Sequence, residues 1–399
     1  MFFALCALGW FAVVLRARIS RGKIFAIFGG VMVGVYTLLA VGLRPPTPSS
    51  PFQTALAGLF YYLHSAVYLH FFMLAKPRFR GNLYRVLVSF PASFMLAGTL
   101  LGLPWALLRP FGVTTGAWVP YLLAFIGILS SFAPRREIVP IAVNRKDRGP
   151  LARVAIDRKA PDDREAFRIV QLTDTHLGPF MSVAALRGFV ERAVALEPDV
   201  VLLTGDFLTM ESQGDARHLR EALEPLRALS GKVVACWGNH DYESPAVVDE
   251  ALAHCGAIVL KDDEVVRETR VGSVQFVGFE FRRGRVRAEA MAAVCTKFPR
   301  RPGMPRLVLL HDPSAIRDLP EGEGDLIFSG HMHGGQLGFV FAGGNGTFLS
   351  LLNVIDHGLW SRGRDLLYAH RGTGHYGFPI RLGVPAEESL LLVRFADEA

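Results

Sequence analysis

Aspartate, histidine and asparagine side chains follow five short apolar runs in the second half of the chain. The segments read RIVQLTDTH, VVLLTGD, VVACWGNHD, LVLLHD and DLIFSGHMH. Their polar residues include Asp174, His176, Asp206, Asn239, His240, Asp241, His311, His331 and His333. Carboxylate, imidazole and amide groups supply oxygen and nitrogen ligands without thiolate, a set that suits Mn, Fe or Zn in a catalytic site. The segments therefore predict a catalytic metal site rather than a structural zinc site.

Seven of these side chains are candidate metal ligands, namely Asp174, His176, Asp206, Asn239, His311, His331 and His333. Within Asp174-x-His176 and His331-x-His333, alternate residues of an extended segment point to the same side, so each pair is expected to hold metal at one place. Seven ligands are too many for one ion and suit two ions about 3.5–4 Å apart, bridged by a carboxylate and a hydroxide. Asp206 alone is also compatible with a helix cap, but the joint pattern favours metal.

Alternating strands and helices are expected to position these ligands. We expect strands at residues 167–172, 200–203, 233–237, 274–279, 307–310, 326–328 and 390–393, and helices at 183–196 and around 219–229. Strands that alternate with helices indicate a layered α/β domain. Because ligands bind beyond the carboxyl ends of strands in open α/β sheets, five such ends would bring the polar residues to one rim.

The ordered motifs D-x-H, G-D, G-N-H-D, a lone His and G-H-x-H resemble those of the calcineurin-like metallophosphoesterases. The words LTDTHLG, LLTGDFLT, WGNHDY and FSGHMHGGQ are similar to the membrane-linked branch of bacterial phosphoesterases, and the resemblance covers roughly residues 150–396. It implies a four-layer αββα sandwich with a dimetal site. It also implies that Asp174, His176 and His333 hold one ion, that Asn239, His311 and His331 hold the other, and that Asp206 bridges them. His240 would be no ligand but a general acid, or a charge partner for the phosphoryl oxygens.

Several residues near these motifs have two interpretations each. Asp241 could orient His240 or cap the next helix. His375 could touch substrate or be a surface side chain. The arginines at 282, 283, 285 and 287 could hold a diphosphate or form a solvated face.

The first third of the chain has the composition of a membrane domain. The 399 residues are 51% hydrophobic and 20% charged, with a net charge of +7. Residues 1–150 carry +13 and residues 151–399 carry −6, while residues 1–133 contain no acid. Because the basic excess lies among apolar runs, we expect membrane topology, and no nucleic-acid partner.

Four apolar runs predict membrane-spanning helices, at residues 24–43, 52–75, 83–108 and 117–133. The third run contains Arg85, Pro91 and Pro104 and is expected to be shortened or kinked. A fifth run, at residues 2–15, is marginal in length. It is interpreted as a short first span or an interfacial helix, because it has no basic leader and no small-residue cleavage site of a signal peptide.

Basic loops at residues 16–23 and 76–82 alternate with loops that hold one arginine each. Since basic loops stay cytoplasmic, we expect the C-terminal half to be cytoplasmic, on a membrane of the bacterial inner-membrane type. His64 and His70 lie within the second run and are either functional or merely packed. The four cysteines, at positions 6, 236, 255 and 295, show no paired spacing and suit free thiols in a reducing compartment.

The sequence thus predicts an α-helical transmembrane bundle of four to five helices over residues 1–133. A linker over 134–165, with one edge strand at 153–157, precedes a C-terminal α/β metallophosphoesterase domain over 166–399. The predicted function is a membrane-integrated phosphohydrolase that cleaves a phosphodiester or pyrophosphate by attack of a metal-bridging hydroxide. Its cofactors would be two divalent ions, with Mn favoured over Zn or Fe.

The resemblance also suggests a substrate, because the membrane-linked branch includes enzymes that cleave UDP-2,3-diacylglucosamine. A lipid-linked substrate is therefore the first hypothesis, with membrane lipids as the other partner. The alternatives are a tethered phosphodiesterase for soluble substrates and a non-catalytic membrane sensor that binds metal or nucleotide.

Overall fold

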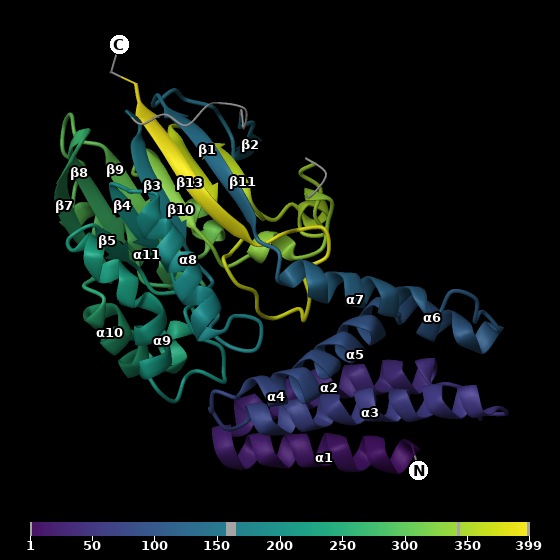
Figure 1. Ribbon diagram of the computed structural model, residues 1–399. Coiled ribbons are helices and arrows are strands. Elements are labelled where there is room, and N and C mark those ends of the chain that lie inside the picture. Colours follow the sequence, from purple (N-terminus) through teal and green to yellow (C-terminus); the bar gives the residue numbers. More distant parts are fainter. Residues whose placement is uncertain (1, 157–164, 341–343, 397–399) are drawn as a thin grey trace. The chain divides into compact units, whose positions relative to one another are not determined.

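The computed structural model describes residues 2–156, 165–340 and 344–396 (Figure 1). By their internal contacts these residues form two compact units. A helical unit contains residues 2–132 together with two short segments from the C-terminal half, 210–214 and 377–382. An α/β unit contains the remaining described residues.

The helical unit consists of α1 (Phe2–Arg21), α2 (Lys23–Leu43), α3 (Pro51–Leu74), α4 (Asn82–Tyr84), α5 (Phe90–Leu101), α6 (Leu103–Leu108) and α7 (Val119–Ser131). By length and composition, four segments can cross a membrane: Phe2–Arg21, Lys23–Leu43, Pro51–Leu74 and Asn82–Leu101. The first differs from the marginal run expected at 2–15, because the helix continues through the basic residues to Arg21 and reaches 20 residues. The run expected at 117–133 is shorter than predicted, since α7 has only 13 residues.

The segment expected to be kinked is interrupted twice. Residues Arg85–Ser89 form a π-helix, called η1, between α4 and α5. Pro91 has no N–H to donate to the carbonyl of Leu87, and that carbonyl accepts a 2.6 Å hydrogen bond from the Tyr62 hydroxyl instead. A second break falls at Gly102, between α5 and α6.

His64 is fully buried and connects α1, α2 and α3. Its Nδ1 lies 2.6 Å from the Tyr36 hydroxyl and its Nε2 lies 3.3 Å from Cys6 Sγ. The ring also stacks against those of Phe2 and Phe60. These contacts account for His64 as a packed, hydrogen-bonded residue between helices.

The α/β unit is built on two sheets. The six-stranded sheet has the order β1 (Arg135–Val143), β13 (Glu387–Phe395), β3 (Phe167–Leu172), β4 (Val200–Leu203), β5 (Val233–Ala235) and β6 (Ile258–Val259). The seven-stranded sheet has the order β2 (Ala152–Val154), β11 (Gly358–Arg362), β12 (Asp365–Ala369), β10 (Leu326–Ser329), β9 (Arg306–Leu309), β8 (Gly272–Gly278) and β7 (Asp263–Thr269). Strands β3 to β6 are parallel, as are β8, β9, β10 and β12.

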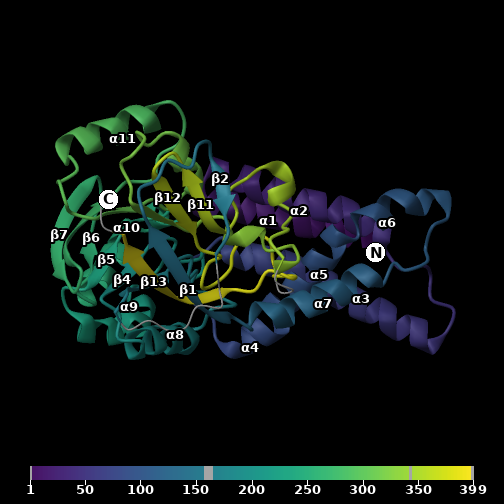
Figure 2. The ribbon, with the colours of Figure 1, turned by 90° about the horizontal axis from the view of Figure 1, so that it is seen from above.

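Helices cover the outer faces of the two sheets and complete a four-layer αββα sandwich. Helices α8 (Val183–Ala195), α9 (Arg217–Leu223) and α10 (Pro245–His254) lie on one side, and α11 (Val286–Lys297) on the other (Figure 2). Successive residues of a strand face opposite layers, so in β9 Leu307 and Leu309 enter the core between the sheets while Val308 packs toward α11. The predicted fold class is confirmed.

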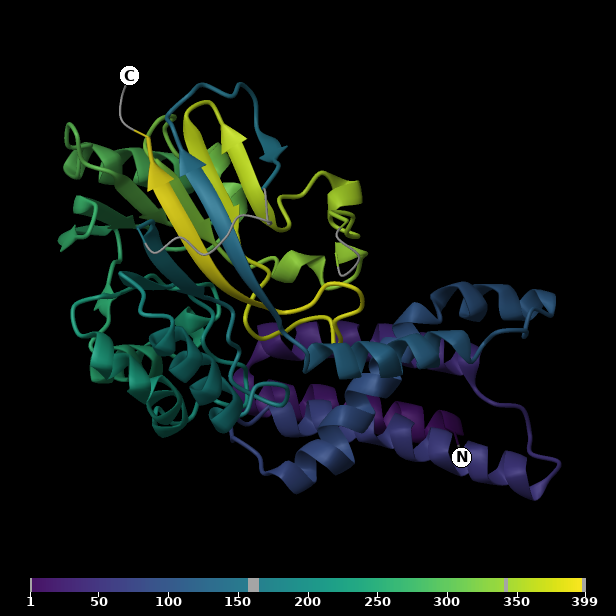
Figure 3. The same ribbon diagram turned by 45° about the horizontal axis from the view of Figure 1, so that its top comes forward.

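The linker expected at residues 134–165 differs most from the structure. Residues Arg135–Val143 form the nine-residue strand β1, which pairs in parallel with β13 (Figure 3). Its partner is distant in sequence, and charged residues and Pro140 disguise its apolar alternation. The expected edge strand at 153–157 is present as β2 at Ala152–Val154, and position 157 lies outside the described residues.

Candidate dimetal site

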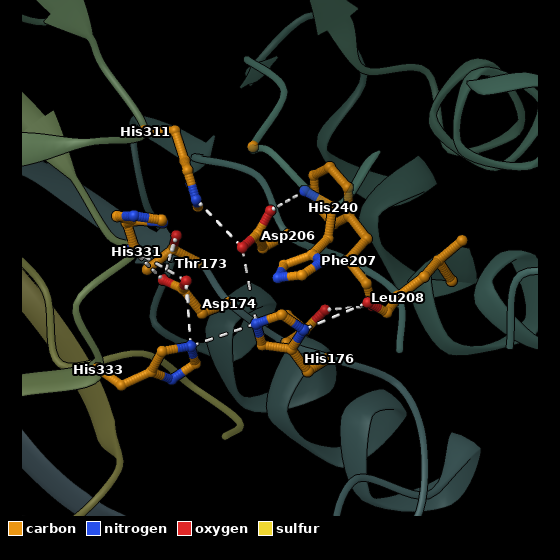
Figure 4. A network of polar contacts seen from close by, with 12 residues as sticks. Thr173, Asp174, His176, Asp206, Phe207, Leu208, His240, His311, His331 and His333 are labelled. Carbon is orange, nitrogen blue, oxygen red and sulfur yellow. Dashed lines mark hydrogen bonds and ion pairs between the residues drawn. The ribbon is translucent and has the colours of Figure 1, made fainter. Parts of the chain in front are cut away.

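The carboxyl ends of five parallel strands carry the predicted ligands. Asp174 and His176 follow β3, Asp206 follows β4, and Asn239 follows β5, all in the six-stranded sheet. His311 follows β9, and His331 and His333 follow β10, in the seven-stranded sheet. Figure 4 shows side chains from both sheets converging on one place.

The ligand atoms gather in two groups. Asp174, His176 and His333 form the first, and Asp206, His311 and His331 form the second; within each group the ligand atoms lie within 4.8 Å of one another. In the first group, His333 Nε2 lies 3.2 Å from His176 Nε2 and 3.4 Å from Asp174 Oδ1. His331 and His333 therefore belong to different groups, so the expectation that this pair binds metal at one place is wrong.

Asp206, a member of the second group, also faces the first. Its Oδ2 is 3.2 Å from His311 Nε2 in one group and 3.7 Å from His176 Nε2 in the other (Figure 4). A carboxylate in this position can contact two ions at once, which is the geometry that a bridging ligand requires.

The histidine tautomers fit metal binding. His311 Nδ1 donates to the carbonyl of Thr204 at 2.7 Å, and His176 Nδ1 donates to the carbonyl of Leu208 at 3.2 Å. Each bond leaves the Nε2 lone pair directed into the site, as second-shell partners do for metal-binding histidines. Burial lowers the pKa of His176 to about 3, so its imidazole is neutral at pH 7, the form that binds a metal ion.

The remaining polar groups make the site attractive to cations. The Asn239 Oδ1 atom is buried and has no hydrogen-bond partner among the described residues. Burial raises the pKa of Asp174 to about 6, and the nearby charge of Asp206 adds to the rise. Although burial alone would lower the pKa of His311, the charge of Asp206 raises it to about 10. Divalent ions would favour the ionised form of Asp174 and the neutral form of His311, and so lower both raised pKa values. The donor set therefore fits a dimetal cofactor.

The backbone at the ligands is strained. Asp174, His176, Asp206, His331 and His333 all have φ between 43° and 67°, the left-handed region that side chains other than glycine rarely adopt. The expectation of extended D-x-H and H-x-H segments is therefore wrong. The ligands converge because sharp turns follow the strands, and such strain typically clusters at functional sites.

Glycines of the motifs allow the close packing of these turns. A Cβ at Gly330 would lie 2.1 Å from Asp174 Oδ2. A Cβ at Gly238 would lie 2.2 Å from Asp206 Oδ1, and one at Gly205 would lie 2.1 Å from the Gly238 nitrogen. Because a side chain at any of these positions would clash with the neighbouring turn, the site requires glycine before each of these ligands.

His240 lies beside the ligand groups without joining either. Its backbone N–H donates to Asp206 Oδ1 at 2.8 Å, and its ring centroid is 5.6 Å from that of His176. Its Nδ1 donates to Glu243 Oε1 at 2.8 Å. Burial lowers the pKa of His240, but the hydrogen bond to Glu243 and the charge of Asp206 outweigh it, and the net pKa is raised. Sequence reasoning missed Glu243, although the His-x-x-Glu spacing within a helical turn could have indicated it.

Asp241 neither orients His240 nor caps a helix, so both interpretations from the sequence were wrong. Its buried carboxylate accepts backbone hydrogen bonds from Asp206 and Gly238 at 2.8 Å each, and from Phe207 at 3.0 Å. It therefore ties the turn after β4 to the turn after β5. Burial and the charge of Asp206 raise the pKa of Asp241 to about 7, whereas the three N–H donors favour its ionised form.

Tyr376 is a further residue that sequence reasoning missed. Its ring stacks on His176 at 4.8 Å and meets His240 edge to face at 5.1 Å. The neighbouring His375 is buried against Phe180, with ring centroids 4.2 Å apart, so it is not a surface side chain. An aromatic residue in a glycine-rich segment after β12 was the available signal.

Two of the four arginines at positions 282, 283, 285 and 287 form ion pairs with acids. Arg282 pairs with Asp262, and Arg287 pairs with Asp312 at 3.0 Å. Arg283 is exposed, lies 5.2 Å from the ring of Phe281, and has no ion pair among the described residues. The ring of Phe281 in turn lies 5.9 Å from that of His331, so Arg283 is close to the site.

Together, the αββα fold and the two ligand groups define a metal-dependent phosphoesterase domain. Residues 167–335 match the family described as calcineurin-like phosphoesterase. This match confirms, for residues 167–335, the calcineurin-like metallophosphoesterase domain predicted from the motifs.

Similar proteins include bacterial phosphoesterases and a vertebrate transmembrane protein. Phosphodiesterase YaeI of Escherichia coli is 28% identical over 236 residues, which cover 58% of this chain and 83% of YaeI. A transmembrane protein with metallophosphoesterase domain from Danio rerio is 28% identical, and the match covers 60% of this chain and 55% of that protein. UDP-2,3-diacylglucosamine pyrophosphatase LpxG of Chlamydia muridarum is 24% identical over 52% of this chain and 78% of LpxG. This chain thus spans about half the length of the vertebrate relative.

Proposed function

We propose that this protein is a membrane-integrated dimetal phosphohydrolase that cleaves a phosphodiester or pyrophosphate bond. The observation that carries the proposal is the pair of ligand groups with Asp206 facing both. The proposed ligands are Asp174, His176 and His333 for one ion, Asn239, His311 and His331 for the other, and Asp206 for both. Mn is the proposed metal, and Zn or Fe are compatible with the same oxygen and nitrogen donors.

In the proposed mechanism each side chain has a defined task. When bound, the two ions supply a water-derived nucleophile at neutral pH and positive charge beside the phosphoryl oxygens. Asp206 holds the backbone N–H of His240 and so fixes this histidine beside the site. Glu243 keeps the proton on His240 Nδ1, which leaves Nε2–H to donate to the oxygen of the leaving group. Tyr376 packs against the His240 ring and limits its movement.

A lipid-linked substrate is proposed because of how the chain is divided. Four helical segments can cross a membrane. Segment 210–214 follows closely after Asp206, segment 377–382 directly follows Tyr376, and both belong to the helical unit. Two segments that follow proposed catalytic residues in the sequence, 210–214 and 377–382, therefore belong to the helical unit. The name of LpxG, a relative that acts on UDP-2,3-diacylglucosamine, supports the same class of substrate.

The catalytic domain is proposed to lie on the cytoplasmic side. Arg21, from the first basic loop, donates to Gln213 Oε1 at 2.8 Å and to the Met210 carbonyl at 3.3 Å. Arg80, from the second basic loop, pairs with Glu211 at 3.2 Å. Both basic loops thus hold the same segment of the C-terminal half, and basic loops stay cytoplasmic.

The test is metal-dependent hydrolysis by the full-length protein purified in detergent. Bis(p-nitrophenyl) phosphate is offered with Mn, Zn or Mg to the wild type and to Asp206→Ala and His240→Ala. His254→Ala, in α10 and outside both ligand groups, is the matched control. We expect the wild type and the control to be active with Mn. His240→Ala should lose activity by about 100-fold or more while it retains its metal content. Asp206→Ala should lose both activity and bound metal.

The substrate class is tested in parallel with UDP-2,3-diacylglucosamine in mixed micelles. Faster hydrolysis of this lipid than of soluble diesters supports the lipid-linked proposal. Hydrolysis of soluble diesters alone would replace it with a tethered phosphodiesterase. No hydrolysis of either substrate by folded, metal-loaded protein would refute the catalytic proposal and favour a binding module.

A further inference from the structure

A group of buried polar side chains surrounds the start of the π-helix η1 in the helical unit. Arg80 and Glu211 form an ion pair at 3.2 Å, with side-chain exposures of 6% and 0%. The Arg80 guanidinium lies 5.0 Å from the ring of Tyr84, and that ring is 6.4 Å from His70. Nothing in the proposed hydrolysis uses these residues.

Arg85 belongs to the same group and is its unsatisfied member. Its positive charge acts on Glu211, and its guanidinium lies 4.8 Å from the ring of Phe79. Arg85 is only 5% exposed, and its Nε and Nη2 atoms have no hydrogen-bond partner among the described residues. A buried guanidinium stays charged, so leaving its donors unpaired is strongly unfavourable.

Other polar groups of this cluster, beside Arg80 or within η1, are also unused. The hydroxyls of Tyr84 and Ser89 and the Nδ1 atom of His70 are buried without a partner among the described residues. Ser89 lies about one helical turn beyond Arg85, at the other end of η1. Short π-helical segments within helices frequently mark functional sites.

The balance of charge favours an anion. Glu211 neutralises Arg80, which also donates to the carbonyl of Met73 in the last turn of α3 and to that of Arg78 in the loop before α4. No ion pair of Arg85 is found within the described residues, so one positive charge remains. A phosphate group offers several acceptor oxygens and binds the planar guanidinium through two parallel hydrogen bonds.

We propose that Arg85, with Tyr84, Ser89 and His70, forms a binding site for a phosphate anion. Inorganic phosphate and the phosphodiester of a phospholipid headgroup present the same oxygens to these donors. Because Arg85 lies in Asn82–Leu101, which is able to cross a membrane, a phospholipid is an available source. The proposal does not depend on the reaction at the dimetal site.

The experiment uses full-length, metal-loaded protein freed of lipid in detergent. The wild type, Arg85→Gln and Arg78→Gln are compared. Arg78→Gln is the matched control, because it removes the same charge from an exposed residue in the loop before α4. The first probe is inorganic phosphate at constant ionic strength, followed by the shift in unfolding temperature. The second is phosphatidylglycerol in phosphatidylcholine vesicles, followed by native mass spectrometry of the retained phospholipid.

We expect the wild type and Arg78→Gln to bind alike and Arg85→Gln to bind about 10- to 100-fold more weakly, because a charged bidentate contact is lost. Any phosphate held at the dimetal site contributes equally in all three proteins. Retention of phosphatidylglycerol without a response to inorganic phosphate identifies a lipid headgroup site, and a response to inorganic phosphate identifies a general phosphate site.

Equal binding by Arg85→Gln and Arg78→Gln, or binding of neither probe by the wild type, would overturn the proposal. If Arg85→Gln does not fold, Ser89→Ala and Tyr84→Phe remove one donor each without changing the charge. Each is expected to weaken binding about 2- to 10-fold, and unchanged affinity in both would also overturn the proposal.

Discussion

Replacing Asp241 with asparagine is expected to loosen the dimetal site without removing any proposed ligand. The carboxylate is fully buried and accepts backbone hydrogen bonds from Asp206, Phe207 and Gly238. One of these donors belongs to the proposed bridging ligand itself. Asp241 thus acts as a positioning residue that holds two catalytic turns together.

The magnitude follows from the number of bonds that asparagine can keep. The shape is unchanged, but one carboxylate oxygen becomes an NH₂ group. If the amide oxygen keeps the bonds from Asp206 and Gly238, the N–H of Phe207 faces a donor and loses its acceptor. A buried hydrogen bond to a charged group contributes about 1.5–3 kcal/mol. Loss of such support typically lowers metal affinity by about 10- to 100-fold.

The assay measures Mn affinity of the full-length protein by competition with a fluorescent chelator, and hydrolysis of bis(p-nitrophenyl) phosphate as a function of Mn concentration. The matched control is Asp249→Asn, because this aspartate is exposed on α10 and its one ion pair among the described residues is with Lys261. We expect Asp241→Asn to need more Mn and to regain most of its kcat at saturation. Mn affinity and kcat equal to those of the control would refute the positioning role.

Three further substitutions test other parts of the α/β unit. Gly330→Ala places a Cβ 2.1 Å from a proposed ligand oxygen, so kcat should fall about 100-fold with loss of bound metal, whereas Gly346→Ala, with open space around it, should behave as wild type in both measurements. Asp325 is buried, which raises its pKa, but two arginines outweigh this and lower it. Since the folded-state pKa of Asp325 lies below its unfolded value, the contribution of this carboxylate to the free energy of unfolding is fully present above about pH 4. It is lost as the pH falls through the folded-state pKa. Asp325→Asn should therefore cost about 1–3 kcal/mol in urea unfolding at neutral pH, and a gap from wild type that does not shrink in acid would contradict this account. Tyr376→Ala should lower kcat about 3- to 10-fold by freeing the ring of His240, while Tyr376→Phe should not; equal losses in both would assign the effect to the hydroxyl.

The strands that carry the ligands were predictable because they are buried on both faces. Phe167–Leu172 and Val200–Leu203 have the bounds expected from their apolar runs. Parallel strands covered by layers on both sides are nearly continuous in hydrophobic residues, so a short run identifies them. The polar residues that follow could be located for the same reason, since each marks the point where burial ends.

Other strands carry no comparable local signal. The hairpin of β11 and β12 includes Trp360, Arg362 and Asp365, and its polar residues are satisfied by contacts such as the 2.7 Å ion pair between Arg362 and Asp365. Strand β1 completes the six-stranded sheet only by pairing with β13, more than 200 residues later. Both depend on partners that a local pattern does not contain.

The same division between local and distant information applies within the site. The types of ligand are a local property, because metal chemistry demands them whatever the backbone does. Their left-handed conformations are maintained by bonds between turns: the Asp174 N–H donates to the Gly205 carbonyl at 2.9 Å, and the His331 N–H donates to Asp174 Oδ1 at 2.9 Å. No single turn would keep this strain alone, so the D-x-H and H-x-H spacings could not reveal it. Residues that bind turns together, such as Asp241, therefore control the geometry that the ligand motifs leave undetermined.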